Sequence, residues 1–220
     1  MPKDEAGLTQ EWGRASLTLE AGARDLGLDL SKDTVERLLS YLDTMRRWNR
    51  IFNLTAIRDP EEMVTRHILD SLAVLPHLPP GPILDVGSGA GLPGVPLALI
   101  DPTREITLLD RSHKRMDFLT EVTARLSLSR VTLICARVED HKPESPYPVV
   151  IARAFASLQD IAQASAHLLA ANGVIVAMKG TLPTEELAAV EAPFKVRAVH
   201  ALKVPGLIGQ RHLVILERPL

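Results

Sequence analysis

The stretch 83–94, with the sequence ILDVGSGAGLPG, constrains the fold of this chain more than any other. It predicts a short buried strand over 83–86, a glycine-rich turn and then the first turn of a helix. Glycines at alternate positions let the backbone turn sharply, adopt positive φ and approach a ligand closely. Asp85 lies near the end of the strand, at the edge of an open α/β sheet where ligands bind.

The spacing of these glycines argues against a dinucleotide site. A dinucleotide fingerprint has the spacing G-x-G-x-x-G, but Leu92 stands where the third glycine belongs. The chain has D-x-G-x-G-x-G instead, formed by Asp85, Gly87, Gly89 and Gly91. This pattern resembles motif I of S-adenosylmethionine-dependent methyltransferases, and a tight turn without any ligand is the alternative interpretation.

Size and composition are those of an ordinary globular protein. The 220 residues suffice for one large domain or two unequal ones, and 46% of them are hydrophobic. We expect no membrane span, because no apolar run is long enough, and no signal peptide, because residues 1–10 are polar. Cys135 is the only cysteine, which favours a reducing cytoplasm, and no metal-ligand spacing occurs, so no metal site is predicted. The net charge of −2 limits any RNA site to a local basic patch.

The first 80 residues predict an N-terminal helical segment. Apolar residues at helical spacing predict helices at 17–26, at 32–48 after an N-cap at Ser31, and at 63–75. The proline-rich stretch 76–82 predicts a domain boundary. We therefore expect a helical subdomain over 1–80 and a second domain over 81–220.

Beyond residue 82 the predicted strands and helices alternate. Strands are expected at 83–86, 106–110, 131–135, 148–152 and 173–178, and helices at 93–100, 112–126, 157–170 and 183–191. Such alternation predicts a parallel, doubly wound α/β sheet. The end of the chain predicts two more strands, at 196–202 and 212–217, joined by a glycine-containing turn. A mainly parallel seven-stranded sheet with a C-terminal antiparallel hairpin is the Rossmann-like fold of class I S-adenosylmethionine-dependent methyltransferases.

Two further stretches follow predicted strands and suit a nucleoside. Asp110 ends the strand at 106–110, where its carboxylate can accept hydrogen bonds from ribose hydroxyls. The alternative is an acid that favours the dipole of the next helix. Val138 and Glu139 follow the strand at 131–135, where an apolar side chain and a polar neighbour can hold adenine. An ordinary exit from the strand is an equally good interpretation of these two residues.

Arg153 and Lys179 end the fourth and fifth predicted strands and are the candidates for catalytic residues. Enzymes that methylate amines often carry (N/D)PP(Y/F) after the fourth strand, where this chain has Arg153, Ala154 and Phe155. That difference argues against methylation of an amine. A structural ion pair with an acid is as good an interpretation for Lys179 as catalysis.

Two basic clusters could bind phosphates, although runs of charge are usually solvated faces. One cluster follows Asp110 and the other lies in the N-terminal segment; their members are Arg111, His113, Lys114, Arg115, Arg46, Arg47, Arg50, Arg58 and Arg66. Trp48, Phe52 and Phe155 are candidates for stacking on bases, with helix packing as the stronger interpretation for Phe52.

Seven segments resemble the RsmG (GidB) family of bacterial small-subunit ribosomal RNA methyltransferases. They are WNRIFNLTAI (48–57), TRHILDSL (65–72), ILDVGSGAGLPG (83–94), LLDRSHKRMDFL (108–119), ARVED (136–140), ARAFASL (152–158) and AMKG (177–180). The pairing of RHILDSL with DVGSGAGLPG is specific to that family, whereas the glycine loop alone indicates only a methyltransferase. The resemblance extends from about residue 40 to the C-terminus.

The resemblance implies transfer of a methyl group from S-adenosylmethionine to N7 of a guanine in 16S rRNA, at position 527 in the customary count. It implies the 30S subunit or its rRNA as partner, and we separately expect no membrane association and a monomer. The cofactor would contact Asp85, Gly87, Gly89, Gly91, Leu92, Asp110, Arg111, Ser112, Arg137, Val138, Glu139 and Arg153. RNA would contact Arg66, Lys114, Arg115, Arg137 and Lys179.

Other functions remain open from the sequence. A methyltransferase for another RNA or a small molecule has the same glycine loop. A non-catalytic RNA-binding module would not need the intact set formed by Asp85, the three glycines and Asp110. An NAD oxidoreductase is disfavoured by Leu92.

Overall fold

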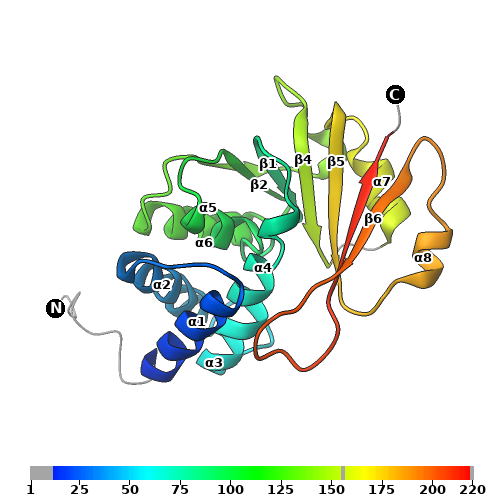
Figure 1. Cartoon of the computed structure of the whole chain (residues 1–220). Helices are drawn as coiled ribbons and strands as arrows, with labels where there is room; N and C mark the ends of the chain where they lie inside the picture. The colour runs from blue at the N-terminus through cyan, green and yellow to red at the C-terminus, as the bar shows by residue number, and fades with distance from the viewer. Residues whose placement is uncertain (1–11, 155–156, 219–220) are drawn as a thin grey trace.

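A single seven-stranded sheet forms the centre of the computed structural model, which describes residues 12–154 and 157–218 (Figure 1). The strand order is β3-β2-β1-β4-β5-β7-β6. The strands are β1 (Ile83–Val86), β2 (Ile106–Asp110), β3 (Val131–Cys135), β4 (Tyr147–Arg153), β5 (Leu169–Lys179), β6 (Lys195–Ala201) and β7 (His212–Glu217). Strands β1 to β5 run parallel, and β7 runs antiparallel to both β5 and β6. The predicted mainly parallel sheet with a C-terminal antiparallel hairpin is confirmed.

The helices divide into a group before the sheet and a group between its strands. The first group is α1 (Gly13–Asp25), α2 (Lys32–Trp48), α3 (Pro60–Met63), the π-helix η2 (Val64–Leu69), α4 (Asp70–Leu72) and the 3₁₀ turn η3 (Leu75–His77). The second group is α5 (Gly94–Ile100), α6 (His113–Arg125), the 3₁₀ turn η4 (Val138–Asp140), α7 (Leu158–Ser165) and α8 (Thr184–Ala188).

Several helix bounds differ from the prediction. The Ser31 side chain accepts a hydrogen bond from the Thr34 amide, which confirms the expected N-cap of α2. The helix predicted at 63–75 is not continuous, because a π-helix interrupts it. The helix predicted at 157–170 ends at Ser165, because β5 already begins at Leu169 and pairs there with β4.

Side chains of the sheet alternate between two hydrophobic clusters, as the period of two along a strand requires. Ile83, Leu108 and Ile151 point into the larger cluster, which also contains buried residues of α1, α2, α5 and α6. Leu84 and Val150 point into the smaller cluster, beside residues of α7. Helices therefore cover both faces of the sheet, as a doubly wound fold requires.

The N-terminal helices share their apolar core with the sheet. Leu39 of α2 and Leu69 of η2 are fully buried in the same cluster as Ile83. Figure 1 shows α1, α2 and α3 gathered beside one end of the sheet. The division at residue 80 remains a prediction. Within the described residues, no helix combines the length and apolarity needed to cross a membrane.

Candidate active site

The loop after β1 is fixed by its own hydrogen bonds. Gly87, Gly89 and Gly91 have φ values of 67°, 59° and 83°, a left-handed conformation that favours glycine. The Gly87 amide donates to the Leu109 carbonyl oxygen at 2.8 Å, and the Gly89 amide donates to Asp110 Oδ2 at 2.9 Å. These bonds hold the loop against the end of β2. The glycine pattern therefore builds a rigid loop at the carboxyl edge of the sheet.

Asp85 is buried beneath this loop, where it supports the start of α5. Its Oδ2 accepts a hydrogen bond from the Gly94 amide at 2.9 Å, and no described group donates to Oδ1. Burial raises the pKa of Asp85 to about 7, although the Gly94 hydrogen bond and the Arg153 charge oppose that rise. Close packing explains Gly94, since a Cβ there would lie 2.8 Å from Asp85 Oδ2.

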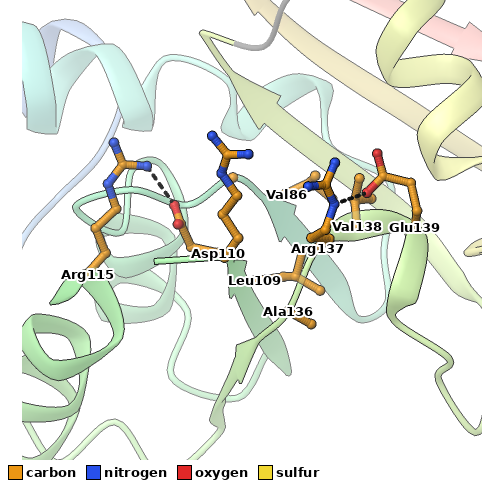
Figure 2. A pocket seen from close by; sticks show the side chains of 10 residues that line it. Val86, Leu109, Asp110, Arg115, Ala136, Arg137, Val138 and Glu139 are labelled. Atoms are coloured by element: carbon orange, nitrogen blue, oxygen red, sulfur yellow. Dashed lines mark hydrogen bonds and ion pairs between the residues drawn. The ribbon is translucent and has the colours of Figure 1, made fainter. Parts of the chain in front are cut away.

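A pocket of about 220 Å³ opens where β1, β2 and β3 end (Figure 2). Its lining residues are Val86, Gly87, Leu109, Asp110, Arg111, Arg115, Ala136, Arg137, Val138 and Glu139. They come from three adjacent strand ends, which is where open α/β sheets bind ligands. Six of these ten positions were predicted as cofactor contacts, and Arg115 was predicted as an RNA contact. Val86, Leu109 and Ala136 were not predicted as contacts, although Val86 ends one predicted strand, Leu109 is the next-to-last residue of another and Ala136 directly follows a third.

Asp110 is the most highly coordinated side chain of the pocket. Its Oδ1 accepts from the Ser112 amide at 2.9 Å, and its Oδ2 accepts from the Gly89 amide and from Arg115 Nη1, each at 2.9 Å. A carboxylate offers about four lone-pair sites, so Oδ1 can accept one further hydrogen bond. The contact with the Ser112 amide lies next to the first turn of α6. Asp110 therefore holds the glycine loop and α6 together while keeping one acceptor site for a ligand.

The rest of the pocket combines an apolar wall with exposed charges. Val138 is buried, whereas Arg111, Arg137 and Glu139 are exposed. Figure 2 shows Arg137 turned toward Glu139, with 3.7 Å between Nε and Oε2. An apolar surface beside a few polar groups is the usual composition of a small-molecule pocket.

Other predicted cofactor contacts do not line this pocket. Leu92 is 4% exposed and packs in the larger core. Gly91 packs against α5 and α6, since a Cβ would lie 2.6 Å from Val95 Cγ2 and 2.8 Å from Leu119 Cδ2. Gly89 and Ser112 contact the pocket residue Asp110 through their amides, whereas Asp85 contacts Gly94.

Arg153 belongs to a second cluster, at the carboxyl end of β4. Its Nη1 donates to Asp70 Oδ2 at 3.2 Å and to the Arg66 carbonyl oxygen at 3.1 Å. Arg211 Nε donates to the other oxygen of Asp70 at 2.8 Å. The Asp70 carboxylate is 4% exposed, so two guanidinium groups share one buried acid. We call this group the Asp70 cluster.

Asp70 and Arg211 were not among the residues predicted from the sequence. Asp70 lies in the segment TRHILDSL, between Leu69 and Leu72, which are both buried. An acid on the buried face of an apolar helix needs a cationic partner, and that requirement was a usable signal. The partners come from the ends of β4 and of the β6–β7 loop, and no sequence pattern identifies them.

Lys179 forms an ion pair at the end of β5. Its Nζ lies 2.7 Å from Glu186 Oε2, and the same oxygen accepts a hydrogen bond from the Leu158 amide at 2.7 Å. The lysine side chain is 14% exposed. Lys179 thus connects β5, α8 and the start of α7, which is the structural interpretation considered above.

The predicted RNA contacts are spread over several surfaces. Arg66 Nε lies 3.9 Å from Glu62 Oε1, and Lys114 Nζ lies 5.5 Å from the centroid of the Phe52 ring. Trp48 Nε1 donates to Glu121 Oε2 at 2.7 Å, and its ring packs on Phe52 and Phe118. Four further arginines predicted to bind phosphate or RNA have a carboxylate oxygen within 4 Å: Arg46, Arg47, Arg115 and Arg137. Arg50 and Arg58 are exposed. Phe155 lies outside the described residues.

The structure offers no metal centre among the residues it describes, where no three His, Cys, Asp or Glu side chains are grouped to hold an ion.

Comparison with known proteins decides the family. The family "rRNA small subunit methyltransferase G" (GidB) matches residues 34–214. A ribosomal RNA small subunit methyltransferase G from Pseudomonas paraeruginosa is 50% identical over 91% of this chain and 94% of its own length. The protein of that name from Methylobacillus flagellatus is 48% identical over 90% of this chain and 96% of its own. The chain belongs to the GidB family. The resemblance inferred from the sequence is thereby confirmed, and a GidB chain is an enzyme, a methyltransferase.

Solved structures confirm the fold of this GidB chain. The glycopeptide N-methyltransferase MtfA, solved with S-adenosylmethionine, has a TM-score of 0.60 and 13% sequence identity. The match covers 70% of this chain and 95% of MtfA. At such a low identity, the match shows only that the two proteins share a fold.

Proposed function

We propose that this GidB enzyme transfers the methyl group of S-adenosylmethionine to N7 of a guanine in 16S rRNA. The observation that carries the proposal is the agreement of two findings. The relatives at 48–50% identity are named ribosomal RNA small subunit methyltransferases, and they cover nearly the whole chain. A nucleoside-sized pocket lies at the carboxyl ends of β1, β2 and β3, where this fold class binds its ligands.

The pocket suits the adenosine portion of the methyl donor. Val138 and Leu109 supply apolar surface for a purine ring, and the free acceptor site on Asp110 Oδ1 suits a ribose hydroxyl. The volume of about 220 Å³ is below the roughly 300–1,000 Å³ common for ligand pockets. That size fits one nucleoside, and the remaining part of the donor would extend along the loop of Gly87 and Gly89. S-adenosylmethionine supplies a methyl group activated by a sulfonium charge.

Guanine N7 demands little acid–base chemistry from the protein. It carries a lone pair and no proton, so methylation requires no general base. The enzyme must hold N7 in line with the methyl group, and orientation alone contributes several kcal/mol, up to about 7–11 kcal/mol in well-aligned systems. Arg153 and Lys179 are proposed to border the methyl-transfer site, each held in place by an acid, Asp70 or Glu186.

The RNA partner requires a local basic surface, because the net charge of the chain is −2. We propose that Arg66, Lys114, Arg115, Arg137 and Lys179 contribute to it. Every one of these cations lies within reach of a carboxylate or an aromatic ring, so each would have to exchange part of that contact for a phosphate. The proposal includes the 30S subunit or its rRNA as substrate, a monomeric enzyme, and the cytoplasm as its compartment.

Calorimetry tests the cofactor. The chain should bind S-adenosylmethionine and not NAD. Asp110→Asn should weaken that binding at least tenfold, because the amide cannot replace a carboxylate that accepts from Ser112, Gly89 and Arg115 at once. Asp117→Asn on α6 changes an exposed acid outside the pocket and is the matched control. Equal loss in both variants would remove Asp110 from the cofactor site.

Product analysis tests the acceptor. 30S subunits from a strain lacking this gene should gain one labelled methyl group, recovered as 7-methylguanosine after digestion of the 16S rRNA. A label recovered on an exocyclic amine, on ribose or on 23S rRNA would contradict the proposal.

A further inference from the structure

The loop between β6 and β7, residues 202–211, carries the most exposed large apolar side chain of the described chain. Ile208 is 95% exposed, compared with 78% for Ile51 and 68% for Leu17. Single exposed apolar residues are common on protein surfaces. Ile208 differs because of how the loop holds it, where the loop lies, and which charges surround it.

The base of the loop is firmly attached to the protein. Val204 is 7% exposed, and Leu202 and Leu207 pack against the larger core. The Leu202 amide donates to the Arg211 carbonyl oxygen at 2.7 Å, which closes the loop. Gly206 lies against η2, where a Cβ would be 3.5 Å from Thr65 Oγ1. Ile208 therefore lies at the tip of an anchored loop. Burying its side chain against a bound partner costs little conformational entropy, because the loop is already ordered.

The loop lies at the edge of the sheet where the substrate is expected. β7 runs antiparallel to β5, and His212 at its start pairs with Lys179 at the end of β5. Arg153 ends the neighbouring strand and pairs with Met178. The end of the loop and the two proposed catalytic residues thus share the carboxyl edge of the sheet. Figure 1 shows the loop between β6 and β7 reaching from this edge toward the N-terminal helices.

Cations surround the base of the loop. In the Asp70 cluster, two guanidinium groups share one carboxylate, which leaves a net positive charge. Each guanidinium has five N–H donors, and Arg153 and Arg211 each use two of them on protein oxygens. Three donors remain on each side chain, in the fork geometry that suits phosphate. Both side chains are about a quarter exposed, so a phosphate can reach them.

We infer that the β6–β7 loop binds the rRNA strand around the target guanine, with the Ile208 side chain inserted against a base. The inference rests on the proposed function. Enzymes that modify a base commonly take it out of the stack to bring it into the active site, which costs a few kcal/mol of stacking. An apolar wedge beside the base lowers that cost by occupying the space the base vacates. The Asp70 cluster would hold the flanking phosphates.

Steady-state methylation of unmodified 30S subunits tests the wedge. Ile208→Ser should lower kcat/KM at least tenfold and leave the affinity for S-adenosylmethionine unchanged, because the cofactor pocket does not include the loop. Ile208→Leu should stay within about twofold of the wild type, since an apolar side chain of the same size remains. Leu17→Ser on α1 removes an exposed aliphatic side chain that does not belong to the loop, and should have no effect.

Crosslinking identifies what Ile208 contacts. A photo-reactive amino acid at position 208 should crosslink to the 16S rRNA nucleotide next to the methylated guanine. A crosslink to a ribosomal protein overturns the inference, and so does an Ile208→Ser variant with wild-type kcat/KM. In both cases a wild-type enzyme that still forms 7-methylguanosine leaves the proposed function intact. A wild-type enzyme that forms none overturns the proposed function instead.

Discussion

At the scale of single residues, the glycines after β1 are required for different reasons. Gly89 has a positive φ but open space, since the nearest atom to an added Cβ would be the Gly87 oxygen at 3.8 Å. Gly91 has a positive φ and no space, because Val95 and Leu119 approach it closely. Alternation of glycines in the sequence predicted the left-handed conformations. It did not predict that Gly91 faces the core, because that depends on where α6 packs.

Replacing Gly91 with alanine separates these two effects. Gly91→Ala should destabilise the protein by about 2–5 kcal/mol, from left-handed strain of about 1–2 kcal/mol and overpacking of about 1–3 kcal/mol. Gly27→Ala is the matched control, because Gly27 has φ 76° and nothing within 4 Å of an added Cβ. It should cost the strain alone. Urea unfolding of both variants measures the difference, and equal costs would show that packing around Gly91 relaxes freely.

The acids of the site were predictable to different degrees. Asp85 and Asp110 follow from their places near the ends of apolar strands, and Asp110 does lie in the pocket. The unpaired Oδ1 of Asp85 was not predictable, because it depends on the Gly94 contact. Arg153 was identified as an important cation. Its partner Asp70 is 83 residues away in the sequence, beyond the reach of any local pattern.

At the scale of elements, the strands were predicted best. The bounds of β1, β2, β3 and β7 match the prediction at both ends, because each strand is a short apolar run. The π-helix η2 was missed. Its apolar positions still follow a helix-like spacing, so the wider turn leaves no clear signal in the sequence.

The Asp70 cluster connects three elements, and its strength is measurable. Asp70 begins α4, Arg153 ends β4, and Arg211 directly precedes β7. A double-mutant cycle of Asp70→Asn and Arg211→Gln should give a coupling of about 1–3 kcal/mol in the free energy of unfolding, because the carboxylate is buried. The cycle separates the interaction between Asp70 and Arg211 from the effects of each single substitution.

An exposed ion pair serves as the control for that cycle. Arg130 Nη1 lies 2.9 Å from Glu105 Oε1, but both side chains are more than half exposed. A cycle of Arg130→Gln and Glu105→Gln should couple by only about 0.2–1 kcal/mol. A coupling for the Asp70 cycle no larger than this would mean that the cluster does not help to attach the β6–β7 loop.

At the scale of the whole molecule, one core joins the N-terminal helices to the sheet, and the glycine loop lies along that junction. Tyr41 of α2 is fully buried and donates to the Ala90 carbonyl oxygen of the glycine loop at 2.5 Å. His67 of η2 is also buried and contacts Thr55 Oγ1 at 3.0 Å. The sequence predicted a helical segment and a sheet domain separately. Their contacts could not be predicted, because helical periodicity shows that a face is buried and not what covers it.

Two buried groups at this junction, Asp85 and His67, make the free energy of unfolding change with pH in opposite directions. The pKa of Asp85 is raised by burial to about 7, so the folded protein binds an extra proton between about pH 4 and 7, and stability falls as pH rises through this window. The pKa of His67 is lowered to about 4, chiefly by burial and then by Arg153. The unfolded protein therefore binds the extra proton between about pH 4 and 6.5, and stability rises with pH there.

Because Asp85 and His67 change stability with pH in opposite directions, removing either group should reveal the pH dependence that the other one causes. Asp85→Asn cannot ionise, so only His67 remains and Tm should rise from pH 4.5 to 6.5. His67→Gln leaves Asp85 alone, so Tm should fall over the same range. Each change should be on the order of 5 °C for a chain of this size, and the double variant should be nearly flat. Thermal unfolding in buffers of constant ionic strength measures all four proteins. Parallel Tm profiles for the two single variants would contradict the assignment, because opposite signs are the one result that the burial of both groups requires.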